Sequence, residues 1–308
     1  MEIIKVSHTV EEVPVYQENS AVTIGKFDGL HRGHMLLVEE TVSKKAAGMQ
    51  AVVIAFCLSC RDALITEDER IRMLENAGVD RLIILPYSKE ILSVEAEDFV
   101  EELLIKRLKL SCLSTGEDFC FGKDRRGNAE LLKKLSAEKS FALSVHPKVL
   151  QGNEEISSSL IKEKLRSGAL SCANEMLGYA YSFSGTVNHG KALGRTLGFP
   201  TLNLVPASRK LLPAYGVYHA EVLMEGRTYQ GIMNLGVRPT VDPEAREPLI
   251  EVFLLDTEGD FYGDMICVRL LRFLRPEKKF ESLEALKAQV EKDIAGIQSS
   301  LQEDTAFT

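Results

Sequence analysis

The sequence predicts two domains of different fold class: an α/β domain on a parallel sheet, then a small antiparallel β-barrel with a C-terminal helix. The chain has 308 residues, 45% of them hydrophobic, which is enough for two cores. Short apolar runs alternate with helical patterns up to Gly178, as is typical of parallel sheets covered by helices. Strand-like runs separated by turn residues then follow, which favours a barrel. We therefore expect an α/β domain at 1–180 and a barrel domain at 181–308.

The α/β half is expected to alternate strands and helices. Short apolar runs predict strands at 21–24, 51–56, 82–85, 112–114 and 142–145. Helical periodicity predicts helices near 34–47, 67–76, 95–107 and 128–137, and two shorter ones at 156–165 and 169–177. Thr66 and Glu69 have the spacing of a capping box, which indicates a helix start. Gly48 and Gly78 stand where helices would end.

The barrel half is expected to consist of short strands and one long helix. We predict strands at 181–187, 216–224, 228–234, 249–255 and 265–273. Segment 282–297 places four apolar residues on one helical face, Leu283, Leu286, Val290 and Ile294. This pattern predicts an amphipathic C-terminal helix.

The charge balance and the cysteines limit the class of partner. With 37 basic and 45 acidic side chains the formal charge is −8, so no global basic field would attract nucleic acid or an anionic membrane. No apolar stretch approaches the ~18 residues that span a bilayer, and the N-terminus lacks the pattern of a signal peptide. We expect a cytoplasmic protein with reduced cysteines. It should act on small molecules, as a monomer or weak homo-oligomer, without binding nucleic acid or membranes.

A glycine-rich segment directly after the first predicted strand is the first candidate site. Glycines at a strand-to-helix turn let the backbone approach a phosphate, and the helix N-terminus then points at the anion. His31 and His34 lie on one face of the starting helix and can donate hydrogen bonds to a phosphate during in-line displacement. The ordinary alternative is two surface histidines in a turn. The segment reads Gly25-Lys26-Phe27-Asp28-Gly29-Leu30-His31-Arg32-Gly33-His34.

Two further segments complete a family pattern, G-E-D-F-C-F-G at 116–122 and I-S-S-S-L-I-K at 156–162. With H-x-G-H at 31–34 they resemble the nucleotidyltransferase superfamily, and in detail the FAD synthetase module of bacterial bifunctional flavin enzymes. The resemblance implies a Rossmann-like fold that transfers AMP from ATP to FMN, with His31 and His34 as catalytic residues and Phe119 at the flavin. It implies that these residues bind the nucleotide: Gly25, Phe27, Asp28, Gly29, Gly33, Asp118, Ser158, Ser159 and Lys162.

The chain departs from that family in two places. Where the family has T-F-x-P-H-P, residues 55–60 read A-F-C-L-S-C. The family's Thr-x-x-Arg appears as Ser159 and Lys162, and Lys lacks the bidentate fork, so we expect a weaker or differently oriented phosphate clamp. Cys57 and Cys60 lack the second ligand pair of a zinc site, so we interpret them as bystander thiols, with a redox pair as the alternative.

The strongest pattern is G-T-V-N-H-G-K-A-L-G-R-T-L-G-F-P-T-L-N at 185–203. Thr201 and Asn203 would point to one side of an extended segment, as two hard oxygen ligands for Mg²⁺ beside nucleotide phosphates. An ordinary barrel turn would not need so many specialised residues. Three glycines would let a phosphate approach main-chain N–H groups and two basic residues would add charge, namely Gly190, Gly194, Gly198, Lys191 and Arg195.

This segment resembles the riboflavin kinase signature, and the likeness continues through 213–218, 234–240, 251–256, 261–263 and 275–280. The resemblance implies that Thr201 and Asn203 bind Mg²⁺ and that Glu251 takes the proton from the ribityl 5′-hydroxyl. Alone, Glu251 would be an ordinary solvated strand residue. The implied nucleotide-binding residues are Gly185, Gly190, Lys191, Gly194, Arg195, Gly198 and Pro200. The implied flavin-binding residues are Asn234, Arg275, Glu277 and Tyr218. Arg275 and Glu277 could instead belong to an ordinary charged surface loop, and Tyr218 could equally be a core aromatic.

Together these patterns predict two reactions. Riboflavin and ATP give FMN and ADP, and FMN and ATP then give FAD and pyrophosphate, with Mg²⁺ as cofactor. One alternative is a riboflavin kinase whose N-terminal module is inactive or acts on another phosphate ester; the altered segment 55–60 separates it from the first hypothesis. The other is a flavin-binding regulatory protein, which would not need the set Thr201, Asn203 and Glu251.

Overall fold

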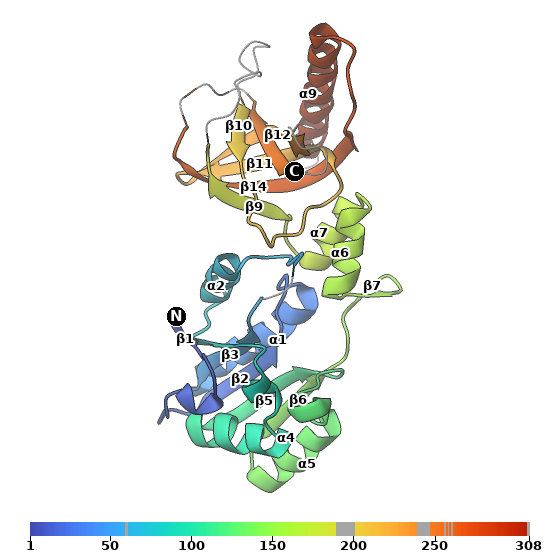
Figure 1. The fold of residues 1–308 in the computed structure, drawn as a ribbon. Helices are drawn as coiled ribbons and strands as arrows, with labels where there is room; N and C mark the ends of the chain where they lie inside the picture. Colours follow the sequence, from blue (N-terminus) through green and yellow to red (C-terminus); the bar gives the residue numbers. More distant parts are fainter. Residues whose placement is uncertain are drawn as a thin grey trace. The chain divides into compact units, whose positions relative to one another are not determined.

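The computed structural model describes residues 1–58, 61–188, 201–238, 247–255, 257, 259 and 261–306. Contacts divide the chain into two compact units, Met1–Leu160 and Ile161–Thr308. The first unit contains a six-stranded parallel sheet and the second a six-stranded antiparallel sheet (Figure 1). Among the described residues, no helix combines the length and the apolar character needed to cross a membrane.

The parallel sheet has the strand order β1-β4-β3-β2-β5-β6. Its strands are β1 (Glu2–Lys5), β2 (Ser20–Gly25), β3 (Gln50–Phe56), β4 (Arg81–Leu85), β5 (Leu110–Gly116) and β6 (Ala142–His146). The five predicted strands are confirmed. The edge strand β1 was missed because its four residues, with a charged residue at each end, form too short an apolar run.

Helices cover both faces of this sheet, which explains why its strands are nearly continuous apolar runs. On β3, Val52 and Ile54 belong to one core and Val53 and Ala55 to the other. The first core includes residues of α5 (Ala129–Lys139) and of the helix at 99–107. The second includes residues of α1 (Arg32–Ser43) and α2 (Glu67–Asn76).

Several helices begin or end where capping residues and glycines in the sequence predict it. Thr66 Oγ1 accepts a hydrogen bond from Glu69 N at 3.2 Å, and Glu69 Oε2 accepts one from Thr66 N at 2.8 Å, so α2 begins with the expected capping box. Gly48 and Gly78 adopt φ of 78° and 90°, the left-handed conformation that ends a helix. A 3₁₀ turn, Lys44–Ala47, follows α1.

The helix predicted at 95–107 has an unexpected winding. It begins with one α-turn, α4 (Ala96–Asp98), and continues as a π-helix at Phe99–Arg107. Its buried residues, Phe99, Val100, Leu103 and Leu104, are followed by buried Leu108, a spacing that suits a wider helix. The remaining short elements of this half are η1 (Val10–Glu12), α3 (Lys89–Leu92), η4 (Lys123–Arg125), β7 (Leu150–Gln151) and β8 (Glu154–Glu155).

Two short helices follow, as predicted, α6 (Ser158–Arg166) and α7 (Leu170–Leu177). By contacts α7 belongs to the second unit. Asn174 of α7 donates from Nδ2 to the carbonyl of Leu270 at 2.8 Å and accepts from Tyr181 N at 2.8 Å. This side chain therefore ties α7 to the antiparallel sheet.

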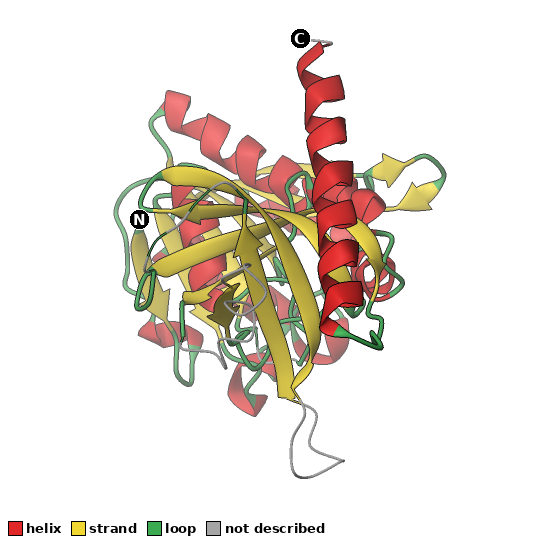
Figure 2. Ribbon diagram, turned by 90° about the horizontal axis from the view of Figure 1, so that it is seen from above, coloured by secondary structure: helices red, strands yellow, loops and turns green. Residues whose placement is uncertain are grey.

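The antiparallel sheet is curled so that its two edge strands meet. The strand order is β10-β13-β12-β11-β14-β9, and Asn188 N, just after β9, donates to Asn203 O of β10 at 2.8 Å. Figure 2 shows its strongly curved strands. The predicted barrel architecture is confirmed, and β10 is an additional strand. The strands are β9 (Ser182–Thr186), β10 (Thr201–Leu204), β11 (Gly216–Met224), β12 (Arg227–Arg238), β13 (Glu247–Leu254) and β14 (Met265–Pro276).

The predicted C-terminal helix, α9 (Leu283–Ala306), packs on the outer face of this sheet. Ile294 and Ile297 contact a small core formed by Val217, Ile232 and Leu255. The helix is longer than the predicted 282–297 because its polar end continues the same winding without an apolar stripe that a sequence pattern could detect.

Candidate active sites

The H-x-G-H segment lies where the strand order of the parallel sheet reverses, between β2 and β5. β2 ends at Gly25 and β5 at Gly116, and the two strands run side by side in parallel. Open α/β sheets bind ligands at the carboxyl ends of the strands beside such a reversal. The predicted segments at 25–34 and 116–122 therefore begin at the same edge of the sheet.

The loop between β2 and α1 is held in a strained conformation. Phe27 and Leu30 adopt positive φ, 51° and 37°, although both side chains are fully buried. The turn between them is fixed at Asp28. Its Oδ1 accepts from Leu64 N at 2.7 Å, and its carbonyl accepts from Ser158 Oγ at 2.8 Å. The structure thus brings the predicted nucleotide residues Asp28 and Ser158 together.

His31 and His34 stack on each other at the start of α1, with ring centroids 3.6 Å apart. His31 is the N-cap of α1 and accepts from His34 N through Nδ1 at 3.4 Å, so a neutral His31 ring carries its proton on Nε2. His34 Nδ1 is buried and has no hydrogen-bond partner among the described residues. His34 Nδ1 therefore keeps its hydrogen-bonding capacity, whereas His31 Nδ1 is used by the His34 amide.

Both imidazoles are neutral at pH 7. Burial lowers the pKa of His31 to about 4, although the charge of Asp28 opposes the shift. Burial, reinforced by the neighbouring His31, lowers the pKa of His34 well below its ordinary value. Neutral imidazoles donate to phosphoryl oxygens without a fixed positive charge.

Two predicted glycines lie against the loop's aromatic rings. A Cβ on Gly25 would come within 3.3 Å of the Phe27 ring, and one on Gly33 within 3.3 Å of His31 Nδ1. A side chain at either position would press on the ring beside it. The absence of a side chain at these two positions therefore leaves room for the rings of Phe27 and His31.

The other predicted residues of this half occupy varied environments. Asp118 is exposed just after β5, with Lys148 Nζ 3.7 Å from its Oδ2. Phe119 is half-buried and stacks on Phe121 with centroids 5.5 Å apart. Ser159 is exposed in the first turn of α6, and Lys162 follows in the same helix.

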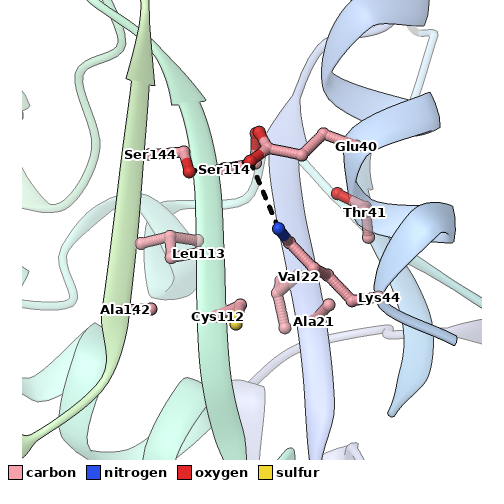
Figure 3. A pocket seen from close by; sticks show the side chains of 10 residues that line it. All are labelled: Ala21, Val22, Glu40, Thr41, Lys44, Cys112, Leu113, Ser114, Ala142 and Ser144. Atoms are coloured by element: carbon pink, nitrogen blue, oxygen red, sulfur yellow. Dashed lines mark hydrogen bonds and ion pairs between the residues drawn. The ribbon is translucent and has the colours of Figure 1, made fainter. Parts of the chain in front are cut away.

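Sequence reasoning missed a polar cluster on the same helix as the histidines. Glu40 of α1 reaches toward β5 and β6, where it accepts from Ser114 Oγ at 2.6 Å and Ser144 Oγ at 2.8 Å (Figure 3). It also forms a hydrogen bond with His146. Burial raises the pKa of Glu40, but these three hydrogen bonds outweigh it and lower the pKa to about 2. Glu40 beside Glu39 has the appearance of a solvated helix residue, so its sequence position gave no signal.

A cavity of about 40 Å³ adjoins this cluster, enough for one or two water molecules. It lies between α1 and the sheet, and the Lys44 ammonium is 3.7 Å from Glu40 at its rim. Its lining residues are Ala21, Val22, Glu40, Thr41, Lys44, Cys112, Leu113, Ser114, Ala142 and Ser144.

In the barrel, strand register aligns three predicted site residues. Asn203 of β10 pairs with Glu251 of β13, and Glu251 pairs with Asn234 of β12. Directly paired residues of antiparallel strands project to the same face, with Cβ atoms roughly 5 Å apart. The predicted metal ligand, base and flavin contact are therefore neighbours on one face. Thr201, two residues before Asn203, shares that face.

The same row continues toward α9. Asn234 pairs with Val217, and Val217 with Arg275. Arg275 donates to Asp293 of α9 from Nε at 3.0 Å and from Nη2 at 2.8 Å. Glu277 lies against Gly236, where an added Cβ would collide with its carboxylate and touch the Asn234 amide. Arg275 and Glu277 thus flank the row that contains Glu251.

Tyr218 is placed differently from these residues. It is fully buried on the interior face of the sheet, donates its hydroxyl to Ala214 O and packs edge-on against Phe273 with centroids 5.1 Å apart. Burial raises its pKa. In this structure it is a core aromatic, the second of the two roles considered for it.

Of the predicted phosphate loop at 185–203, the structure describes only residues 185–188 and 201–203. Gly185 lies in β9, with Leu204 of β10 in van der Waals range of a Cβ added there. The other predicted nucleotide residues lie outside the described residues, namely Gly190, Lys191, Gly194, Arg195, Gly198 and Pro200. Segment 55–60 is described up to Leu58, and the described cysteines, Cys57 among them, are free thiols.

Comparisons with known proteins assign both halves. The riboflavin kinase family profile matches residues 177–301 and the FAD synthetase profile residues 13–160. The bifunctional riboflavin kinase/FMN adenylyltransferase of Escherichia coli K12 is 35% identical over 95% of this chain and 96% of its own length. The Haemophilus influenzae protein of the same name is 33% identical, over 96% and 97%.

A crystal structure described as a macrolide-efflux protein from Streptococcus pneumoniae is 29% identical, with a TM-score of 0.86 over 96% of this chain and 98% of that one. The similarity to the bifunctional relatives spans both units and nearly their full lengths. The chain therefore belongs to the family of bifunctional riboflavin kinase/FMN adenylyltransferases.

Proposed function

We propose that this chain makes FAD from riboflavin in two steps at two separate sites. The barrel phosphorylates riboflavin with ATP, and the α/β unit adenylylates the FMN with a second ATP. The observation that carries the proposal is that Thr201, Asn203 and Glu251 share one face of two paired strands, because a flavin-binding protein without turnover needs no metal pair and base. We assign residues 1–180 to adenylyl transfer and 181–308 to the kinase.

At the kinase site, Glu251 acts as the base. Its carboxylate accepts the proton of the ribityl 5′-hydroxyl as the oxygen attacks the γ-phosphorus of ATP, and ADP leaves. The oxygens of Thr201 and Asn203, on the same face as Glu251, suit a hard cation, so these two residues would hold Mg²⁺. Mg²⁺, when bound, neutralises phosphate charge. Asn234, Arg275 and Glu277 position the flavin.

At the adenylyl-transfer site, the chain positions phosphates and stabilises charge. A phosphate oxygen of FMN attacks the α-phosphorus of ATP, and pyrophosphate leaves. The neutral rings of His31 and His34 donate N–H groups to the oxygens on which charge develops. The N-terminus of α6, with Ser158 and Ser159, would receive the leaving pyrophosphate, and Lys162 would add charge.

The proposed setting is the cytoplasm, with the protein as a monomer or weak homo-oligomer. ATP, riboflavin and FMN are the proposed partners, and nucleic acid and membranes are not. The net charge of −8 supports the exclusion of nucleic acid and anionic membranes from the proposed partners.

The direct test is to incubate the purified protein with riboflavin, ATP and MgCl₂ and to separate the flavins over time. FMN followed by FAD is expected. FMN alone would restrict the chain to the kinase reaction, and unchanged riboflavin would rule out both activities. Removing divalent cations with EDTA should stop the first step, and adding MgCl₂ back should restore it.

A further inference from the structure

Arg70 of α2 is a fully buried arginine that no part of the reaction described above uses. Its Nη1 donates two hydrogen bonds to main-chain carbonyls, to Lys26 O at 2.8 Å and to Phe56 O at 2.7 Å. Its Nη2 holds the Glu67 carboxylate at 2.7 and 2.8 Å. Burying a guanidinium is costly unless it is paired and its donors are satisfied, and both conditions hold here.

The two carbonyls belong to the ends of two neighbouring strands. β2 and β3 pair in parallel up to Gly25 and Ala55, so Lys26 and Phe56 are the residues that follow that pair. Lys26 opens the loop that leads to His31, and Phe56 is the last residue of β3. One guanidinium nitrogen therefore joins the two chain segments that leave the sheet at the adenylyl-transfer site.

The loop after Lys26 needs such an external restraint. Phe27 and Leu30 are buried with positive φ, and residues in that conformation persist only where surrounding contacts fix them. Asp28 is fixed by Leu64 and Ser158 in the middle of the loop. At the loop's first residue, Arg70 supplies the corresponding contact.

We propose that Arg70 is a positioning residue for adenylyl transfer. It touches neither ATP nor FMN; it holds the entrance of the 26–31 loop and the end of β3 at a fixed separation. His31 and His34 then lie where charge develops on the transferred phosphate. The inference rests on adenylyl transfer occurring at the H-x-G-H site.

The test measures FMN-to-FAD conversion in full-length R70M, R70K and T66A. T66A is the matched control because it removes the N-cap bond of the same helix and touches neither carbonyl. We expect R70M to lower kcat at least ~10-fold with KM for ATP changed less than ~3-fold. R70K should recover most of the rate, since an ammonium keeps the positive charge and has three donors for the two carbonyls. T66A should stay within ~2-fold of wild type, as a cap change is remote from the chemistry.

Riboflavin-to-FMN conversion is measured on the same samples, so that failure of the proposed function can be distinguished from failure of the role of Arg70. No FAD formation by the wild type would refute the proposed function. Wild-type FAD formation with equal rate losses in R70M and T66A, or with R70K no better than R70M, would refute the role of Arg70. If R70M does not fold, hydrogen exchange of R70Q replaces it: amides of 26–31 should exchange faster while those of α2 do not. Unchanged exchange in that loop would overturn the proposal.

Discussion

His31 and His34 of the H-x-G-H segment are held as neutral rings, and this makes the protein sensitive to acid. The pKa of His31 is about 4 in the fold and near 6.5 when exposed. Between those values the unfolded chain binds more protons than the folded one, so stability falls as pH drops from about 6.5 to about 4. His34, with its pKa also lowered, acts in the same direction.

The pH dependence can be measured by urea denaturation between pH 7 and pH 4. We expect the midpoint to fall with pH in the wild type and to fall less in His31→Gln, which has no proton to gain on unfolding. Equal slopes for the two proteins would contradict the buried neutral state. The comparison with the variant removes the contribution of the carboxylates, which both proteins share.

The proposed role of Glu251 is confined to one of the two reactions. Glu251→Gln keeps the size of the side chain but cannot accept the proton, so the rate of FMN formation should fall at least ~100-fold. Conversion of added FMN to FAD should be unaffected. Chromatography of the flavins distinguishes the two products, and equal loss of both activities in a folded variant would show that Glu251 is not the kinase base.

The sequence pointed to candidate site residues, but it did not reveal which other residues they contact in the fold. Asn203 was predicted from its extended segment, and Glu251 and Asn234 from resemblance, while the register that brings the three together is a tertiary property of three strands. Arg70 and Glu40 were missed because charged residues in a polar helix segment usually face solvent. Their burial depends on which helix face meets the sheet, which local patterns do not reveal.

At the scale of elements, Glu40 ties α1 to the last two strands of the parallel sheet. Glu40→Ala would leave Ser114, Ser144 and His146 without their shared acceptor, so we expect a loss of about 2 kcal/mol in unfolding free energy. Glu39→Ala, at the exposed neighbouring position, is the matched control and should change stability by less than about 0.5 kcal/mol. Similar losses in both variants would mean that the Glu40 cluster adds no stability.

The strands and helices themselves were largely predictable, because both faces of the parallel sheet are apolar and helix ends carry caps. What could not be predicted was the winding of Phe99–Arg107, since α- and π-helices share the same apolar residues at slightly different spacing. The edge strand β1 and strand β10 were missed because each has only two apolar residues among its four.

At the scale of the whole molecule, the two sites are expected to communicate only through FMN in solution. His31→Ala should form FMN from riboflavin without converting it, and Glu251→Gln should convert FMN without forming it. A mixture of the two variants with riboflavin, ATP and MgCl₂ should therefore produce FAD after a lag that shortens as protein concentration rises. No FAD from the mixture, with each half-reaction intact, would indicate that FMN is not released.

The bridge from Asn188 to Asn203 also affects how the protein behaves in concentrated solution. Open sheet edges offer unpaired main-chain groups to other chains and promote aggregation. Here the two edge strands of the second sheet meet each other, so those groups are partly satisfied within one molecule. The bridge uses main-chain atoms of Asn203, so replacing its side chain to test the proposed metal site should leave the contact between the two edge strands intact. Kinase-deficient variants at this position should therefore remain as resistant to aggregation as the parent.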